Sequence, residues 1–130
     1  MGKNQDKEFL FKLSMFEQQI QHLQQQLQAV DEGIMDMNSL SLGLDEVKNS
    51  IGKEVLAPLG RGIFVETELL SDKLMVDVGG RNFVKKSVPE TKEIIEAQIK
   101  KLYEIKKELG EKIEEINEEL TRIILEAQET

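Results

Sequence analysis

Apolar residues in the first part of the chain recur at alternating steps of four and three, the spacing of heptad a and d positions. They are Phe9, Leu13, Phe16, Ile20, Leu23, Leu27, Val30, Ile34 and Met37. This register next requires Ser41 and Lys48, but the apolar residues Leu40 and Val47 lie one residue earlier, which predicts a stammer near Met37. The pattern predicts a coiled-coil helix over residues 5–52, with Gly52 as the residue that ends it.

A second ladder with the same spacing runs through the last third of the chain and predicts a helix over residues 88–128. Its members are Ile95, Ile99, Leu102, Lys106, Leu109, Ile113, Ile116, Leu120, Ile123 and Ala127, of which only Lys106 is polar. Ser87 and Glu90 have the spacing of a capping box at its start. Because each helix has one apolar seam, the two should pack on each other as an antiparallel pair, with Phe9 and Ala127 at the same end.

In residues 53–87 the helical spacing of apolar residues stops. Apolar residues recur there at every second position, which predicts four short strands. The expected strands are 54–58, 63–70, 73–78 and 81–87, joined as two hairpins by glycine-containing turns. Four strands cannot close a barrel alone, and their open edges invite pairing with other chains. The apolar residues expected to mediate this assembly are Val55, Ile63, Val65, Leu69, Leu74, Val76, Val78 and Phe83.

The predicted fold class is therefore α+β: a long antiparallel two-helix coiled coil with two β-hairpins at its hinge, forming an oligomeric β-barrel platform. Residues 1–130 are expected to form a single domain. The composition agrees with such a chain, since 39% of residues are hydrophobic, 32% are charged and only 5% are aromatic.

Composition also narrows the function classes. The net charge of −8 argues against nucleic acid as a partner, and no apolar run is long enough for a membrane span, so a cytoplasmic protein is expected. One histidine, no cysteine and scattered carboxylates argue against an enzyme. The Gly60-Arg61-Gly62 stretch lacks the Lys-Ser/Thr of a phosphate-binding loop, and we expect no metal or cofactor.

The order of coil, two hairpins and coil resembles the prefoldin family, specifically its α class, because the β class has a single hairpin at this point. The resemblance covers nearly the whole chain and is most specific in LAPLGRGIFVETEL and KLMVDVGGRNFVKK. The turn GGRNF departs from the GAG more often seen in α subunits. High glutamate and lysine content without cysteine suggests an archaeal member.

The resemblance implies a hexamer of two α and four β subunits built on a double β-barrel, from which six coiled coils project. It implies an ATP-independent chaperone, a holdase, which captures unfolded proteins at the coiled-coil tips and passes them to a group II chaperonin. An alternative within the resemblance is an α-like (γ-type) prefoldin that forms homomeric filaments as a structural or chaperone scaffold. The sequence does not decide between these two assemblies.

The ends of the two predicted helices carry more apolar residues than a two-stranded seam can bury, as binding of exposed hydrophobic client segments would require. The predicted client-binding residues are Phe9, Leu10, Phe11, Leu13, Met15, Phe16, Leu120, Ile123, Ile124 and Leu125. The alternative is that the additional residues cover frayed helix ends or pack on a neighbouring arm. Residues 111–130 also carry seven glutamates against two basic residues, which fits either attraction of basic client segments or a solvated helix face.

Overall fold

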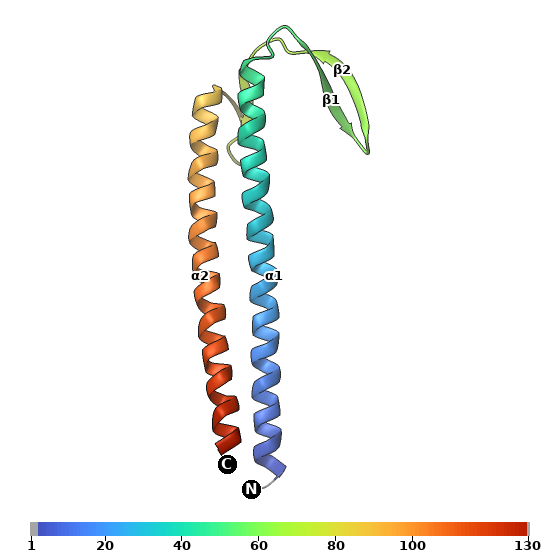
Figure 1. Cartoon of the computed structure of the whole chain (residues 1–130). Coiled ribbons are helices and arrows are strands. Elements are labelled where there is room, and N and C mark those ends of the chain that lie inside the picture. Colours follow the sequence, from blue (N-terminus) through green and yellow to red (C-terminus); the bar gives the residue numbers. More distant parts are fainter. Residues whose placement is uncertain (1–2, 130) are drawn as a thin grey trace. The chain divides into compact units, whose positions relative to one another are not determined.

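A computed structural model describes residues 3–129, as two helices and four strands in the order α1, β1, β2, β3, β4, α2 (Figure 1). Two long helices with two small antiparallel hairpins confirm the predicted α+β class. The helices are α1, Lys3–Lys48, and α2, Val88–Glu129, and the strands are β1, Glu54–Gly60; β2, Ile63–Glu68; β3, Leu74–Asp77; and β4, Phe83–Lys86. The four strands lie within the four predicted segments except at the end of β1, which extends two residues further, to Gly60.

The chain divides into two compact units. The terminal unit is Met1–Ile34 with Lys101–Thr130, and the hairpin unit is Met35–Lys100. Each unit therefore contains one part of α1 and one part of α2, and the hairpin unit also contains all four strands.

In the terminal unit the two helices run antiparallel. Near one end, Phe9 of α1 and Ile123 of α2 line the same shallow groove. Further along, Asp31 and Lys106 form an ion pair of 2.8 Å, and the Leu102 side chain lies 3.5 Å from where a Cβ on Gly33 would be. The heptad seam predicted from the sequence is therefore the surface along which these segments meet.

The core of the hairpin unit is a cluster of buried apolar side chains from both helices, Leu44, Val88 and Ile95. Met37, Val47, Ile99 and, from β3, Leu74 pack against it. Lys92 and Asp45 form an ion pair of 2.5 Å at its surface.

The predicted stammer near Met37 is wrong. Ser41, in the original register, is half-buried, whereas Leu40 is 50% exposed. The inward face changes register only after Leu44, where Val47 is half-buried and Lys48 is exposed. Keeping the register through Ser41 avoids overwinding a continuous helix, and a small hydroxyl side chain tolerates partial burial.

The C-terminal end of α1 also differs from expectation. The helix ends at Lys48, and the N–H groups of Asn49 and Ser50 donate to the carbonyls of Glu46 and Val47. Gly52 has a positive φ of 81° but does not follow the helix directly. Its N–H donates to the Leu69 carbonyl at 2.8 Å, so Gly52 ties the start of the first hairpin to its end.

Each hairpin is an independent two-stranded sheet. In the first, β1 pairs with β2 from Glu54 opposite Glu68 to Gly60 opposite Ile63. In the second, β3 pairs with β4 from Leu74 opposite Lys86 to Asp77 opposite Phe83. Both turns contain residues with positive φ, including the non-glycine residues Arg61 and Arg81. Each turn therefore depends on neighbouring glycines to hold a left-handed backbone.

Candidate functional site

The predicted client-binding residues of α1 fall into two groups by exposure. Phe9, Leu13 and Phe16 are half-buried along the seam. Leu10 and Phe11, which lie off the seam, are 62% and 66% exposed. Met15 is also exposed, so this segment of α1 presents large apolar side chains to solvent beside a seam that is complete without them.

The facing segment of α2 repeats this division. Leu120 and Ile123 are half-buried, whereas Ile124 is 37% exposed and Leu125 is 54% exposed. All ten predicted residues belong to the terminal unit, where contacts across the seam bring the two helix ends together. The structure thus places the predicted apolar residues at one end of an antiparallel helix pair.

Charged residues border this apolar end. The shallow groove between the helices is lined by Glu8, Phe9, Lys12, Ile123, Glu126 and Ala127. Its chemistry combines apolar side chains at the seam with carboxylates and one ammonium group. The groove could hold an apolar side chain of another molecule, flanked in that molecule by polar residues.

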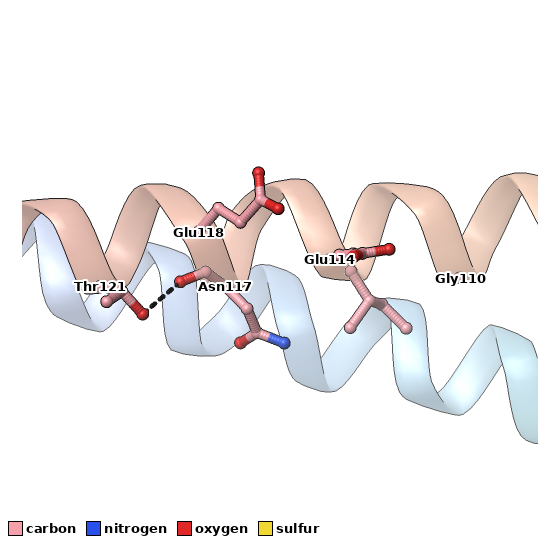
Figure 2. A pocket seen from close by; sticks show the side chains of 6 residues that line it. Gly110, Glu114, Asn117, Glu118 and Thr121 are labelled. Atoms are coloured by element: carbon pink, nitrogen blue, oxygen red, sulfur yellow. Dashed lines mark hydrogen bonds between the residues drawn. The ribbon is translucent and has the colours of Figure 1, made fainter.

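A second open groove runs along α2 in the terminal unit (Figure 2). It is lined by Gly110, Ile113, Glu114, Asn117, Glu118 and Thr121. Thr121 Oγ1 donates to the Asn117 carbonyl at 2.9 Å, so the threonine hydroxyl is engaged within the helix. Sequence reasoning did not single out this groove; its signal is Gly110, a helix-interior residue without a side chain to fill the space.

Lys106, the polar member of the second ladder, donates across the seam of the terminal unit to Asp31 of α1. This hydrogen bond, with the charge of Asp31, raises the pKa of Lys106. The sequence marked Lys106 as an interruption of the seam but did not identify its partner.

The start of α2 is held by the predicted capping box. Ser87 Oγ donates to Glu90 Oε1 at 2.9 Å, and the Glu90 N–H donates to Ser87 Oγ at 3.2 Å. The Ser87 N–H also donates to Glu90 Oε1. These bonds from Ser87, with smaller contributions from the charges of Lys86 and Lys73, lower the pKa of Glu90.

The predicted assembly residues occupy different environments in the two hairpins. Ile63, Val65, Val78 and Phe83 are exposed, and Val55, Leu69 and Val76 are half-buried. Leu74 is already used within the chain, because it packs against the helical core. Further apolar residues that the sequence analysis did not select are exposed as well: Leu56, Leu59, Phe64, Met75 and Val84.

The grooves in residues 3–129 are shallow and open, and no three His, Cys, Asp or Glu side chains of this range are placed so that they could hold a metal ion. Within the same residues, no helix combines the length and apolarity needed to cross a membrane.

Known proteins share this arrangement of two long helices and two hairpins. The family model described as Prefoldin subunit matches residues 16–130. The chain belongs to the prefoldin family. Prefoldins are chaperones rather than enzymes, and this membership supports a chaperone subunit role.

Relatives named Prefoldin subunit alpha confirm the expected resemblance to archaeal α-class prefoldins. The protein from Methanosphaera stadtmanae is 31% identical over 84 residues, which are 65% of this chain and 61% of that protein. The protein from Methanobrevibacter smithii is 30% identical over 102 residues, 78% of this chain and 70% of the relative. The match therefore spans less than two thirds of the length of the Methanosphaera protein.

A solved structure shares the fold. The cryo-EM structure of filamentous PFD from Methanocaldococcus jannaschii superposes with a TM-score of 0.78 at 27% sequence identity. The superposition covers 88% of this chain and 97% of that chain. Prefoldin α subunits form oligomeric complexes, in keeping with the exposed apolar hairpins of this chain.

Proposed function

We propose that this prefoldin chain is a subunit of an ATP-independent holdase, which captures unfolded proteins at the ends of its helices in the terminal unit. The observation that carries the proposal is the exposure of Leu10, Phe11 and Leu125 beside a seam formed by other residues. A helix that only had to pair with its partner would place polar residues at these positions. Large apolar side chains left in water favour binding of exposed apolar segments of an unfolded chain.

The shape and chemistry of this end suit clients of many sequences. Leucine, phenylalanine and methionine side chains bind through area rather than through directed hydrogen bonds, and methionine adapts its shape to its neighbours. The nearby groove adds carboxylates from Glu8 and Glu126, which would favour client segments with basic residues. Each such contact is weak, so efficient capture requires the helix pairs of several subunits to bind one client together.

The hairpins would supply that multivalency by joining several chains. Their strands have unpaired edges, and apolar residues such as Ile63 and Phe83 are exposed on them. The full proposal is a complex of two α-class chains with four β-class prefoldin subunits, in which the hairpins form the barrel platform. Clients would then pass from the arms to a group II chaperonin.

A homomeric filament is the second candidate. The observation in its favour is the solved structure described as filamentous PFD, which this chain resembles along most of its length. Mass measurement of the purified chain, with and without a β-class subunit, distinguishes the two assemblies.

The test of client capture compares two sets of exposed apolar residues. Leu10→Ser, Phe11→Ser and Leu125→Ser together remove apolar surface at the end of the terminal unit. Burying one such side chain stabilises binding by roughly 1.5 to 3 kcal/mol, so protection of an unfolded protein against aggregation should fall at least about tenfold. The assay contains no ATP, and the size of the complex is measured in parallel.

The matched control is Leu40→Ser with Leu42→Ser. These residues are 50% and 70% exposed but belong to the hairpin unit, so protection should remain unchanged. If the terminal variant assembles normally and protects as well as the unmodified chain, clients are held elsewhere and the proposal fails.

A further inference from the structure

The open groove along α2 continues toward the apolar end of the terminal unit (Figure 2). Gly110, Glu114, Asn117 and Thr121, which line it, are three or four residues apart and therefore follow one side of the helix. Ile124 comes next at the same spacing, and its side chain is 37% exposed. At about 1.5 Å per residue, the stretch from Gly110 to Ile124 is about 21 Å long. One surface thus leads from the groove to the proposed client-binding end.

The groove has an apolar base and room above it. Ile113, a half-buried residue of the seam, contributes apolar surface to the lining. A Cβ on Gly110 would meet no atom within 4 Å, so another backbone can approach α2 closely at this point. Helices pack by placing the side chains of one in the grooves of the other. The groove therefore offers what a packed helix requires.

The carboxylates beside the groove are not neutralised by the chain. Residues 108–119 contain six glutamates and one lysine, whereas residues 18–28 of α1 contain seven glutamines and no lysine or arginine. Contacts at Phe9–Ile123 and Asp31–Lys106 place these two segments along each other. Within residues 3–129, neither Glu114 nor Glu118 forms an ion pair. Cations on another molecule would therefore be attracted to this side of α2.

The groove has no free backbone groups that could pair with an extended chain. It is lined by α2 alone, whose backbone groups bond within the helix, and the Thr121 hydroxyl donates to the Asn117 carbonyl at 2.9 Å. An extended segment would lose water from its N–H and C=O groups on the side facing Ile113 without gaining a strand to pair with. A helical segment pairs these groups internally.

We propose that this side of α2 binds an amphipathic helical segment with lysine or arginine beside its apolar stripe. The stripe would cover Ile113 and Ile124, with the bound backbone near Gly110 and the basic residues beside Glu114 and Glu118. This inference rests on the proposed capture of clients in the terminal unit, and it names the class of client segment. A surface about 21 Å long accommodates about 14 helical residues.

Binding of a defined peptide tests the inference. The probe is a fluorescently labelled peptide of leucine, alanine and lysine, about 18 residues or five helical turns long, with its leucines on one face. Gly110→Gln fills the groove with an uncharged side chain, and Glu114→Gln with Glu118→Gln removes its carboxylates. Each change should weaken binding of the peptide to the full chain at least about tenfold, equivalent to about 1.4 kcal/mol. Fluorescence anisotropy measures the affinity.

Matched variants in the hairpin unit are the controls. Gly43→Gln makes the same change at another glycine inside a helix where a Cβ has open space. Glu93→Gln with Glu96→Gln makes the same change in net charge at exposed positions of α2, at least about 21 Å along the helix from Gly110. This separation exceeds the Debye length of about 10 Å at 0.1 M salt, so both controls should bind the peptide normally. Circular dichroism checks that all variants keep their helices.

Two further peptides test the chemistry of the bound segment. One has the same composition in an order that places the leucines on no common face, and the other has glutamate in place of lysine. Both should bind the unmodified chain at least about tenfold more weakly than the probe. Binding of the probe should also weaken between about 0.1 and about 1 M NaCl, because salt screens its attraction to the carboxylates.

Either of two results would overturn the inference: groove variants that bind the probe as tightly as the unmodified chain, or a reordered peptide that binds as tightly as the probe. The proposed function is tested separately, by protection of an unfolded protein after Leu10→Ser, Phe11→Ser and Leu125→Ser. If these substitutions abolish protection while the groove variants bind the probe normally, only the class of client segment is wrong. If protection persists but the groove variants lose the probe, the groove inference stands and the proposed site of capture fails.

Discussion

The hairpin unit and the outer segments of the terminal unit use the same heptad pattern but bury it to different depths. In the hairpin unit, Leu44, Val88 and Ile95 are all at most 7% exposed. The terminal unit buries Ile34 and Leu109 as deeply, at 6% and 7% exposed, but seam residues nearer its helix ends, such as Ile20 and Ile123, are only half-buried. Two helices alone can therefore bury a seam residue, but solvent reaches the edges of the seam toward the helix ends. In the hairpin unit, Leu74 of β3 adds a third element to the core.

This difference matters for function. A half-buried seam with additional exposed apolar residues can rearrange its side chains at little cost, which suits the proposed capture of many clients. A buried core with a capped helix start gives the hairpins a fixed base. The predictions below test whether the units differ in this way.

The largest expected effect comes from matched isoleucine substitutions in the two units. Ile95→Ala removes a side chain that is 5% exposed in the core of the hairpin unit and should lower the free energy of unfolding by about 2 to 5 kcal/mol. Ile20→Ala removes a half-buried side chain of the terminal unit and should cost about 1 kcal/mol. Urea denaturation followed by circular dichroism measures both. Equal losses would contradict the difference in burial.

The cap of α2 should have the next largest effect. Ser87→Ala removes the hydroxyl that bonds to Glu90 and should lower the free energy of unfolding by about 1 kcal/mol. Ser14→Ala, at an exposed position inside α1, is the control and should be neutral or slightly stabilising. A comparable loss at Ser14 would show that the effect is not capping.

The same cap predicts a dependence on pH. The pKa of Glu90 is lowered in the folded chain, so its carboxylate contributes stability that is full above the unfolded pKa. That contribution is lost as the pH falls through the lowered folded value. The stability difference between the unmodified chain and Glu90→Gln should therefore be largest near neutral pH and shrink in acid. A difference that grows in acid would contradict this sign.

Glycine substitutions should affect the two units equally. Gly43 lies in the hairpin unit and Gly110 in the terminal unit, both inside helices, and a Cβ at either would meet no atom within 4 Å. Replacing each by alanine should stabilise the chain by about 0.5 to 1 kcal/mol. Thermal melting measures the gain. Unequal gains would mean that helix propensity, and not only burial, differs between the units.

The smallest effect should come from Lys106→Gln, because this residue and Asp31 are both about half exposed. The pair raises the pKa of Lys106, so its contribution is present below the unfolded pKa and lost as the pH rises through the raised value. At neutral pH the variant should be slightly less stable at low salt and indistinguishable at high salt. A loss that persists at high salt would point to packing of the lysine stem instead.

Local patterns in the sequence predicted much of the fold. The two helices, the four strands and the Ser87–Glu90 cap follow from periodicity and from chemistry between residues close in the chain. The apolar residues of the candidate site were also predictable, because Leu10, Phe11 and Leu125 lie off a seam that the spacing defines. The α2 groove at Gly110 was not predicted, because a glycine inside a helix is a weak signal and whether it leaves a groove depends on what packs beside it.

What the sequence by itself determined is therefore the kind and order of the elements, since backbone preferences act over a few neighbouring residues. Only the tertiary structure decided that Ser41 rather than Leu40 turns inward, that Lys106 pairs with Asp31, and that Leu74 packs on the helical core instead of remaining free for assembly. Each of these depends on which residue faces it from a distant part of the chain. Periodicity indicates that a face is apolar, but burial depends on how much of that face the opposing element covers.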